Sequence, residues 1–205
     1  MSLVHTDTPG SMNEPSGAAA SAPARPLDRA AARLAPVFFF AVLTWVGARI
    51  SVPLPGTPVP ATVQTLAVLL AGAFLGRRAG SASQALYILM GAAGLPVFAL
   101  PGAGPTYLLG PTGGYLVGFV AAAWVVGSLL DRGGKRGALR AAAAFLLGAA
   151  TIHLCGLGWL SVVLGDPAAA LRAGVLPFVL FDLAKVVIAT GVYSGYLRWK
   201  PSTRP

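Results

Sequence analysis

The chain has 205 residues, of which 56% are hydrophobic and only 10% are charged, and its formal net charge is +9. A soluble domain carries about 25% charged residues, so this composition excludes an ordinary water-exposed surface and indicates an integral membrane protein. The basic residues lie between apolar segments and do not form one patch with interleaved aromatic residues, which argues against a nucleic-acid-binding protein.

The first 30 residues are rich in Ala, Ser, Pro and Gly and contain no apolar segment. Such a segment buries too little apolar surface to fold, and it lacks the apolar stretch of a signal peptide. We therefore expect residues 1–30 to be a disordered cytoplasmic tail and residues 31–200 to form one substrate-binding membrane domain.

Six apolar segments follow this tail, and they predict an all-α membrane protein, a compact bundle of six transmembrane helices. A helix needs about 20 apolar residues to cross a bilayer, so the second and third segments are short. They form either a buried helical hairpin or spans shielded by their neighbours. The expected helices are residues 34–50, 62–76, 81–94, 113–130, 138–164 and 175–197.

The basic residues assign a side of the membrane to each connection, because cytoplasmic loops are enriched in Lys and Arg. Only Arg49 and Arg172 fall on the expected outer side. Both termini are therefore predicted to be cytoplasmic. The residues expected inside are Arg25, Arg29, Arg33, Arg77, Arg78, Arg132, Lys135, Arg136, Arg140, Arg198, Lys200 and Arg204.

Two connections on the expected outer side, residues 51–61 and 94–112, are rich in Pro and Gly. The first has four prolines in eight positions, which forbids a helix and favours an extended chain. The second is long and apolar, and exposed irregular backbone is costly in lipid. We expect these two loops to form a lid over a pocket rather than plain solvated connections.

An acidic and a basic residue interrupt the last apolar segment. Asp182 and Lys185 are three residues apart, so on a helix their side chains share a face. Each charge costs about 2.5–3.5 kcal/mol at a helix centre, and such residues commonly mark a ligand or ion path. A purely structural ion pair is the alternative interpretation.

A second candidate cluster, with the sequence Gly-Pro-Thr-Gly-Gly-Tyr, occupies residues 110–115. Its glycines, Gly113 and Gly114, would let a ligand approach the backbone at a helix start, whose free N–H groups favour an anion or a carbonyl oxygen. Thr112 and Tyr115 add hydroxyl groups. A glycine-rich turn without a ligand is the alternative.

Single polar and aromatic residues complete the candidate site. Gln64 lies at the outer end of the second span, where it can face a pocket. His153 has no partners at metal-ligand spacing, so we interpret it as a hydrogen-bonded core residue, and Cys155 as a buried thiol. The remaining candidates are Tyr107 and Phe98, with Gln84 and Tyr87.

No nucleophile–base motif and no phosphate-binding loop occurs in the sequence. We therefore expect no catalytic residues, no metal and no cofactor. Since the chain has no site for ATP hydrolysis, active transport would draw energy from a partner or an ion gradient.

Four segments resemble the BioY family, the biotin-binding substrate-capture (S) components of energy-coupling factor (ECF) transporters. They are residues 58–66, 91–99 and 110–116 and the pair Asp182 and Lys185. The resemblance runs in order from about residue 34 to 197. It implies high-affinity biotin uptake across the bacterial cytoplasmic (inner) membrane, with a biotin site near the outer face, under the outer loops.

The resemblance also implies partners besides the lipid bilayer, namely an ECF coupling transmembrane subunit and a pair of cytoplasmic ATP-binding subunits. Biotin chemistry suits the candidates, because Asp182 can accept a ureido N–H and Lys185 can donate to the ureido carbonyl. Tyr107 or the Thr112–Tyr115 helix start would then donate to the valeryl carboxylate. Two alternatives are an S component for thiamine or riboflavin, and a biotin transporter that acts without an ECF module.

Overall fold

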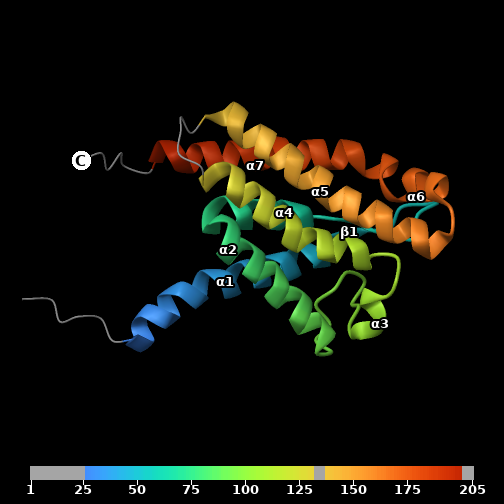
Figure 1. Ribbon diagram of the computed structural model, residues 1–205, viewed down its shortest axis with the longest axis horizontal. Coiled ribbons are helices and arrows are strands. Elements are labelled where there is room, and N and C mark those ends of the chain that lie inside the picture. The colour runs from blue at the N-terminus through green and yellow to red at the C-terminus, as the bar shows by residue number, and fades with distance from the viewer. Residues whose placement is uncertain (1–25, 132–136, 200–205) are drawn as a thin grey trace, which may run out of the picture.

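The computed structural model describes residues 26–131 and 137–199, and most of them are helical (Figure 1). A 3-10 turn, η1, covers Leu176–Phe178. Two short strands, β1 (Ser51–Val52) and β2 (Ala61–Thr62), pair antiparallel. The helices are α1 (Pro26–Arg49), α2 (Gln64–Ala92), α3 (Pro105–Leu108), α4 (Gly113–Asp131), α5 (Ala138–Leu164), α6 (Pro167–Gly174) and α7 (Val179–Trp199).

The predicted bundle of six helices is confirmed, with one change in how its second and third members are joined. These two run together as α2, which is interrupted at Gly76. Four further segments within the described residues are long and apolar enough to cross a membrane: α1, α4, α5 and the stretch from α6 through α7. Many apolar side chains on the outside of the bundle are exposed, as lipid contact requires.

Helix α4 lies at the centre of the bundle. In its membrane window 61% of the residues are buried, against 28% or less in the other candidate spans. Glycines let the neighbouring backbones approach it. A Cβ at Gly72 of α2 would lie 2.6 Å from the carbonyl oxygen of Ala123, and a Cβ at Gly127 would lie 2.2 Å from the backbone nitrogen of Arg77. The close packing of small residues thus supplies contacts that the hydrophobic effect does not supply between helices in lipid.

Gly76 has φ 76° and ψ 176°, a backbone conformation that is essentially restricted to glycine. We expect Gly76→Ala to destabilise the folded protein by about 1–3 kcal/mol, because alanine must adopt this strained conformation. A Cβ there would also lie 3.0 Å from a carboxylate oxygen of Asp131. Thermal unfolding in detergent measures the effect. Gly158→Ala, at an open position, is the matched control, and equal melting temperatures for the two variants would contradict the expectation.

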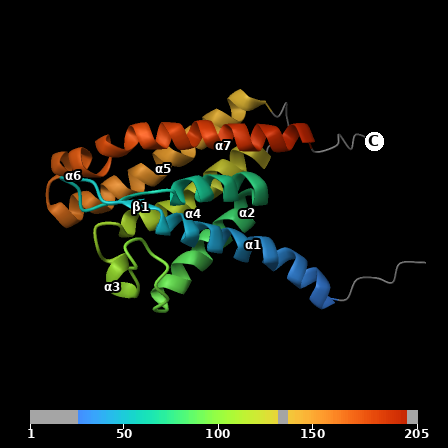
Figure 2. The same ribbon diagram turned by 180° about the vertical axis from the view of Figure 1, so that it is seen from behind.

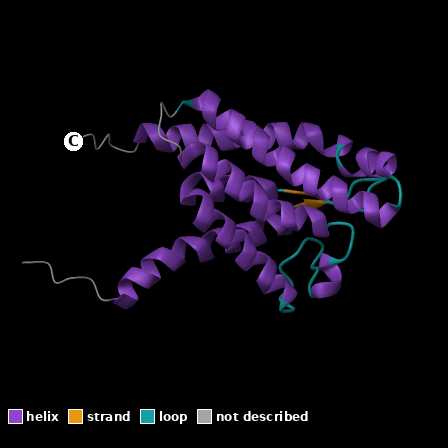
Figure 3. Ribbon diagram, viewed as in Figure 1, coloured by secondary structure: helices purple, strands orange, loops and turns teal. Residues whose placement is uncertain are grey.

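The irregular segments gather at one end of the bundle, while α1 begins and α7 ends at the other (Figures 1 and 3). The rear view places α6 and the β1–β2 hairpin at that same end (Figure 2). The proline-rich loop forms no helix, as predicted, but it is paired as extended strand only at its two ends, where Ser51 pairs with Thr62, and it turns in between. The guanidinium of Arg49 donates a hydrogen bond to the Pro96 carbonyl and lies 5.7 Å from the Trp45 ring, which ties the second loop to α1.

The two described ends of the chain lie on the same side of the bundle, as the predicted topology requires. Which side faces the cytoplasm stays a prediction. The predicted disordered tail lies outside the described residues as far as residue 25, and α1 begins at Pro26. Six of the basic residues used for the topology also lie outside them: Arg25, Arg132, Lys135, Arg136, Lys200 and Arg204.

Candidate functional site

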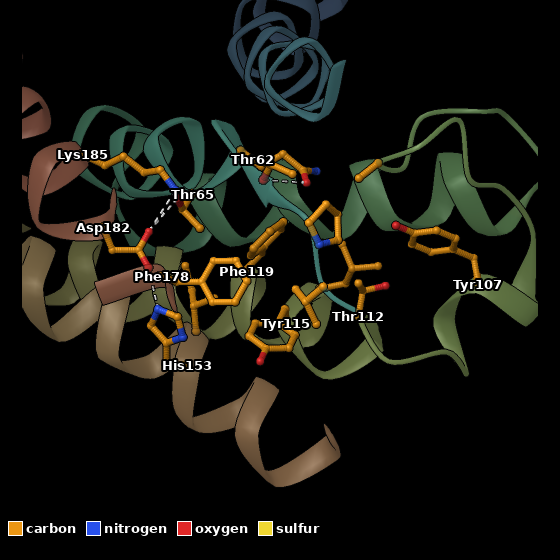
Figure 4. Close-up of a pocket in the computed structure, with 16 residues that line it drawn as sticks. Thr62, Thr65, Tyr107, Thr112, Tyr115, Phe119, His153, Phe178, Asp182 and Lys185 are labelled. Atoms are coloured by element: carbon orange, nitrogen blue, oxygen red, sulfur yellow. Dashed lines mark hydrogen bonds and ion pairs between the residues drawn. The ribbon is translucent and has the colours of Figure 1, made fainter. Parts of the chain in front are cut away.

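A pocket lies at the end of the bundle that carries the loops (Figure 4). The two predicted lid loops both contribute to its wall, the first through Val59 and Pro60 and the second through Ala99 and Tyr107. The other lining residues are Thr62, Gln64, Thr65, Thr112, Tyr115, Leu116, Phe119, Ile152, His153, Phe178, Asp182 and Lys185.

One end of the pocket holds a cluster of polar side chains from three helices. Within the described residues, Asp182 is the one charged side chain in the buried core, 8% exposed. Its Oδ1 accepts hydrogen bonds from Lys185 Nζ at 3.0 Å and from Thr65 Oγ1 at 3.4 Å. Its Oδ2 lies 2.5 Å from His153 Nε2. The Asp182 carboxylate is therefore held from α7, α2 and α5 at once.

The spacing of the sequence explains how these groups meet. Residues three apart on a helix face the same way, which brings Lys185 of α7 next to Asp182. Thr65 lies in the first turn of α2, directly after the β1–β2 hairpin, and His153 lies in the middle of α5. The pairing removes most of the cost of placing two charges in a membrane-embedded wall.

Counting donors and acceptors shows what this cluster can still bind. A carboxylate has about four lone-pair positions, and three neighbours occupy three of them. An ammonium has three N–H groups, and one points to Asp182. The cluster can therefore accept one hydrogen bond and donate two, a combination that suits a ligand with an N–H next to a carbonyl oxygen.

The middle of the pocket is apolar. Figure 4 shows the rings of Phe178, Phe119 and Tyr115 between the charged cluster and the opposite end. Leu116 and Ile152 complete this stretch of wall. A sulfur-containing ring or an alkyl chain would pack here without losing hydrogen bonds.

Hydroxyl groups lie at the end opposite Asp182, where Figure 4 places Tyr107 and Thr112. Burial raises the pKa of the Tyr107 hydroxyl above its ordinary value. The phenol of Tyr107 is therefore a hydrogen-bond donor at neutral pH. This end can take an acceptor such as a carboxylate, although its donors are uncharged.

The predicted role of the Tyr115 hydroxyl changes. It donates a 2.7 Å hydrogen bond to the Gly174 carbonyl at the end of α6, so its proton is already used. The Tyr115 ring lines the pocket, and the hydroxyl fixes α6 against α4. Its contribution to a site is therefore apolar surface rather than a donor.

Five of the candidate site residues do not line the pocket: Gly113, Gly114, Phe98, Gln84 and Tyr87. A Cβ at Gly113 would lie 1.8 Å from the Leu108 carbonyl oxygen, and one at Gly114 would lie 2.3 Å from the Trp159 Cβ. Both glycines serve close packing instead of ligand approach. Phe98 is fully buried and stacks on Tyr107 at 4.8 Å, so it supports a pocket residue from behind.

Gln64 lines the pocket as predicted, but its amide also belongs to a hydrogen-bonded chain. Its Nε2 donates to the Tyr87 hydroxyl at 2.6 Å, which donates in turn to the Val97 carbonyl at 3.1 Å. The start of α2 is thereby joined to the second loop. Gln84 lies behind the site and accepts a hydrogen bond from Thr44 at 3.1 Å.

Sequence reasoning missed His153, Thr65 and the aromatic wall. His153 is hydrogen-bonded, as expected, yet it faces the pocket rather than the core. The sequence could not show this role, because the partner of His153, Asp182, is 29 residues away on another helix and the two meet only in the folded protein. No group of three potential metal ligands among His, Cys, Asp and Glu occurs in the described part of the chain.

Comparison with known proteins assigns this architecture to a family. The sequence profile of the BioY family matches residues 18–202. The chain belongs to the BioY family. The resemblance predicted from its sequence motifs is thereby confirmed.

Two similar BioY proteins and one solved structure extend this result. The biotin transporter BioY of Thermotoga maritima is 42% identical over 150 residues, which cover 73% of this chain and 86% of the relative. The probable biotin transporter BioY of Pyrococcus horikoshii is 41% identical over 153 residues, covering 75% and 88%. A crystal structure of the S-component for biotin from an ECF-type ABC transporter superposes with a TM-score of 0.77 at 21% identity, covering 86% of this chain and 96% of that one. The last comparison shows that the bundle has the fold of that S-component.

Proposed function

We propose that this protein binds biotin from the outer side of the membrane and takes part in its uptake as the S component of an ECF-type transporter. The observation that carries the proposal is the pocket, in which a paired carboxylate and ammonium lie at one end of an apolar slot. The names of its BioY relatives support the choice of ligand.

The chemistry of biotin follows the pocket from end to end. The ureido ring carries N–H groups beside a carbonyl oxygen, and it would pair with Asp182 and Lys185 through charge-assisted hydrogen bonds. The thiophane ring and valeryl chain would lie against Phe119 and Phe178. The valeryl carboxylate would accept hydrogen bonds from Thr112 and the Tyr107 hydroxyl.

The proposal places the protein in the bacterial cytoplasmic membrane, with a coupling transmembrane subunit and ATP-binding subunits as its partners. The sequence has no phosphate-binding loop of its own, so the energy for release would come from those partners. We propose a binding protein rather than an enzyme, and biotin recovered from the complex should be chemically unchanged.

Calorimetry on the purified protein in detergent tests the choice of ligand. We expect biotin and desthiobiotin to bind, because both carry the ureido ring, and thiamine and riboflavin not to bind. Desthiobiotin should bind more weakly, since it lacks the thiophane ring that fills the apolar stretch. Binding of thiamine or riboflavin in place of biotin would overturn the proposal, and so would the absence of biotin binding by folded protein.

A further inference from the structure

His153 makes the shortest polar contact in the pocket, yet neither the family motifs nor the sequence gave it a role. Its Nε2 lies 2.5 Å from Asp182 Oδ2, and its side chain is 17% exposed. We propose that His153 is a positioning residue, which holds one oxygen of Asp182 so that the carboxylate and Lys185 keep a fixed pattern of free donors and acceptors toward the ligand. This inference rests on the proposed function, since the ligand in question is biotin.

The surroundings of the imidazole determine which nitrogen carries the proton. Nδ1 of His153 is buried and has no hydrogen-bond partner among the described residues. A carboxylate oxygen only accepts hydrogen bonds, so the 2.5 Å contact with Asp182 Oδ2 needs a proton on Nε2. A proton on Nδ1 alone would leave that buried donor unpaired and would turn the lone pair of Nε2 toward the carboxylate. The geometry therefore places a proton on Nε2 of His153, which donates to Asp182.

Aromatic rings hold the imidazole in this orientation. The Tyr115 ring lies edge-on to it, with ring centroids 6.2 Å apart, and the Phe178 ring lies 6.3 Å away. The position of Tyr115 is fixed in turn by its hydrogen bond to Gly174. The direction of the Nε2–H bond is thus set by packing on α4 and η1 before any ligand arrives.

Without His153, the carboxylate of Asp182 would be free to rotate toward Lys185 and pair with it through both oxygens. That arrangement would use a second ammonium N–H and turn the free lone pair away from the cavity. With His153 present, Oδ2 is held on the α5 side, while Oδ1 takes Lys185 and Thr65. The free lone pair of Asp182 and the free N–H groups of Lys185 are therefore already placed to bind a ligand that has an N–H next to a carbonyl.

Two substitutions separate positioning from simple space filling. Phenylalanine fills the volume of His153 but has no donor, whereas the glutamine side-chain nitrogen can take the place of Nε2. We expect His153→Phe to weaken biotin binding by about tenfold to a hundredfold, the effect of losing a hydrogen bond to a charged group. We expect His153→Gln to bind within about threefold of the unsubstituted protein. Equal affinity of His153→Phe and the unsubstituted protein would overturn the proposal, as would a His153→Gln variant as weak as His153→Phe.

A spectroscopic measurement does not depend on the ligand. The sequence has two histidines, so His5→Gln leaves His153 as the one labelled residue. Nitrogen NMR of this protein in detergent should show a proton on Nε2 of His153, and Asp182→Asn should weaken that preference. An Nε2 without a proton, or an even mixture of tautomers, would overturn the positioning role whatever the affinities.

The binding measurements and the NMR measurement together distinguish a failure of this inference from a failure of the proposed function. If folded protein does not bind biotin, the proposed function fails, while the tautomer still reports whether His153 holds Asp182. If His153→Phe does not fold, the glutamine variant and the NMR spectrum decide the outcome together.

Discussion

Replacing Asp182 by Asn is expected to lower the affinity for biotin by about a hundredfold or more. The amide has no charge, so it leaves the Lys185 ammonium, 3.0 Å away and 14% exposed, without its counter-ion. The asparagine amide also replaces one acceptor oxygen with an NH₂ donor. This donor would face either the N–H of His153 or the N–H of the ligand, and two donors cannot form a hydrogen bond with each other. Removing one partner of a buried, hydrogen-bonded charge pair costs about 2–5 kcal/mol in binding, and 1.4 kcal/mol corresponds to a factor of ten.

Calorimetry with biotin measures this loss, and Asp166→Asn is the matched control. Asp166 is exposed and caps α6 through a 2.8 Å bond to the Ala168 amide, a role that asparagine also fills. Lys185→Met should cause a similar loss, because it leaves Asp182 without its cation. Wild-type affinity in both Asp182→Asn and Lys185→Met would show that the ligand binds elsewhere.

Replacing Gly114 by Val is expected to prevent stable folding. The new Cβ would lie 2.3 Å from the Trp159 Cβ and 2.6 Å from the Cys155 carbonyl oxygen. Since the oxygen belongs to the α5 backbone, the clash cannot be relieved by a side-chain rotation, and α4 must move away from α5. Overpacking commonly costs about 1–3 kcal/mol, and we expect a value at or above the top of that range here.

The yield of monodisperse protein and its melting temperature in detergent test this expectation. Gly158→Val is the matched control, because it adds the same side chain to α5 at a position with open space around it. If Gly114→Val has the same melting temperature as Gly158→Val, the close approach of α4 and α5 is not needed for stability.

The helices were predictable because lipid imposes a simple rule on sequence. Long apolar segments separated by basic or proline-rich connections leave few alternatives to a bundle, and α1, α4, α5 and α7 follow that rule. The sequence did not show that the second and third segments are joined at Gly76. A turn containing Arg77 and Arg78 between two helices and a single helix kinked at Gly76 would have the same sequence features. Glycine tolerates both.

The candidate site was predictable where its chemistry was unusual for a membrane. Asp182 and Lys185 stood out as charges in an apolar segment, and both line the pocket. Gly113 and Gly114 do not line the pocket, and their sequence could not show this, because a glycine that admits a ligand and one that admits a neighbouring helix have the same local sequence. His153 was missed because one histidine in an apolar helix gives no sign of its partner on α7.

The pairing of Asp182 with Lys185 has a consequence for how the protein responds to membrane voltage. A single charge moving across the bilayer gains or loses about 2.3 kcal/mol per 100 mV. The two opposite charges lie 3.0 Å apart on one helix, so the forces of the electric field on them nearly cancel. The membrane potential therefore does not drive movement of α7 through these two residues.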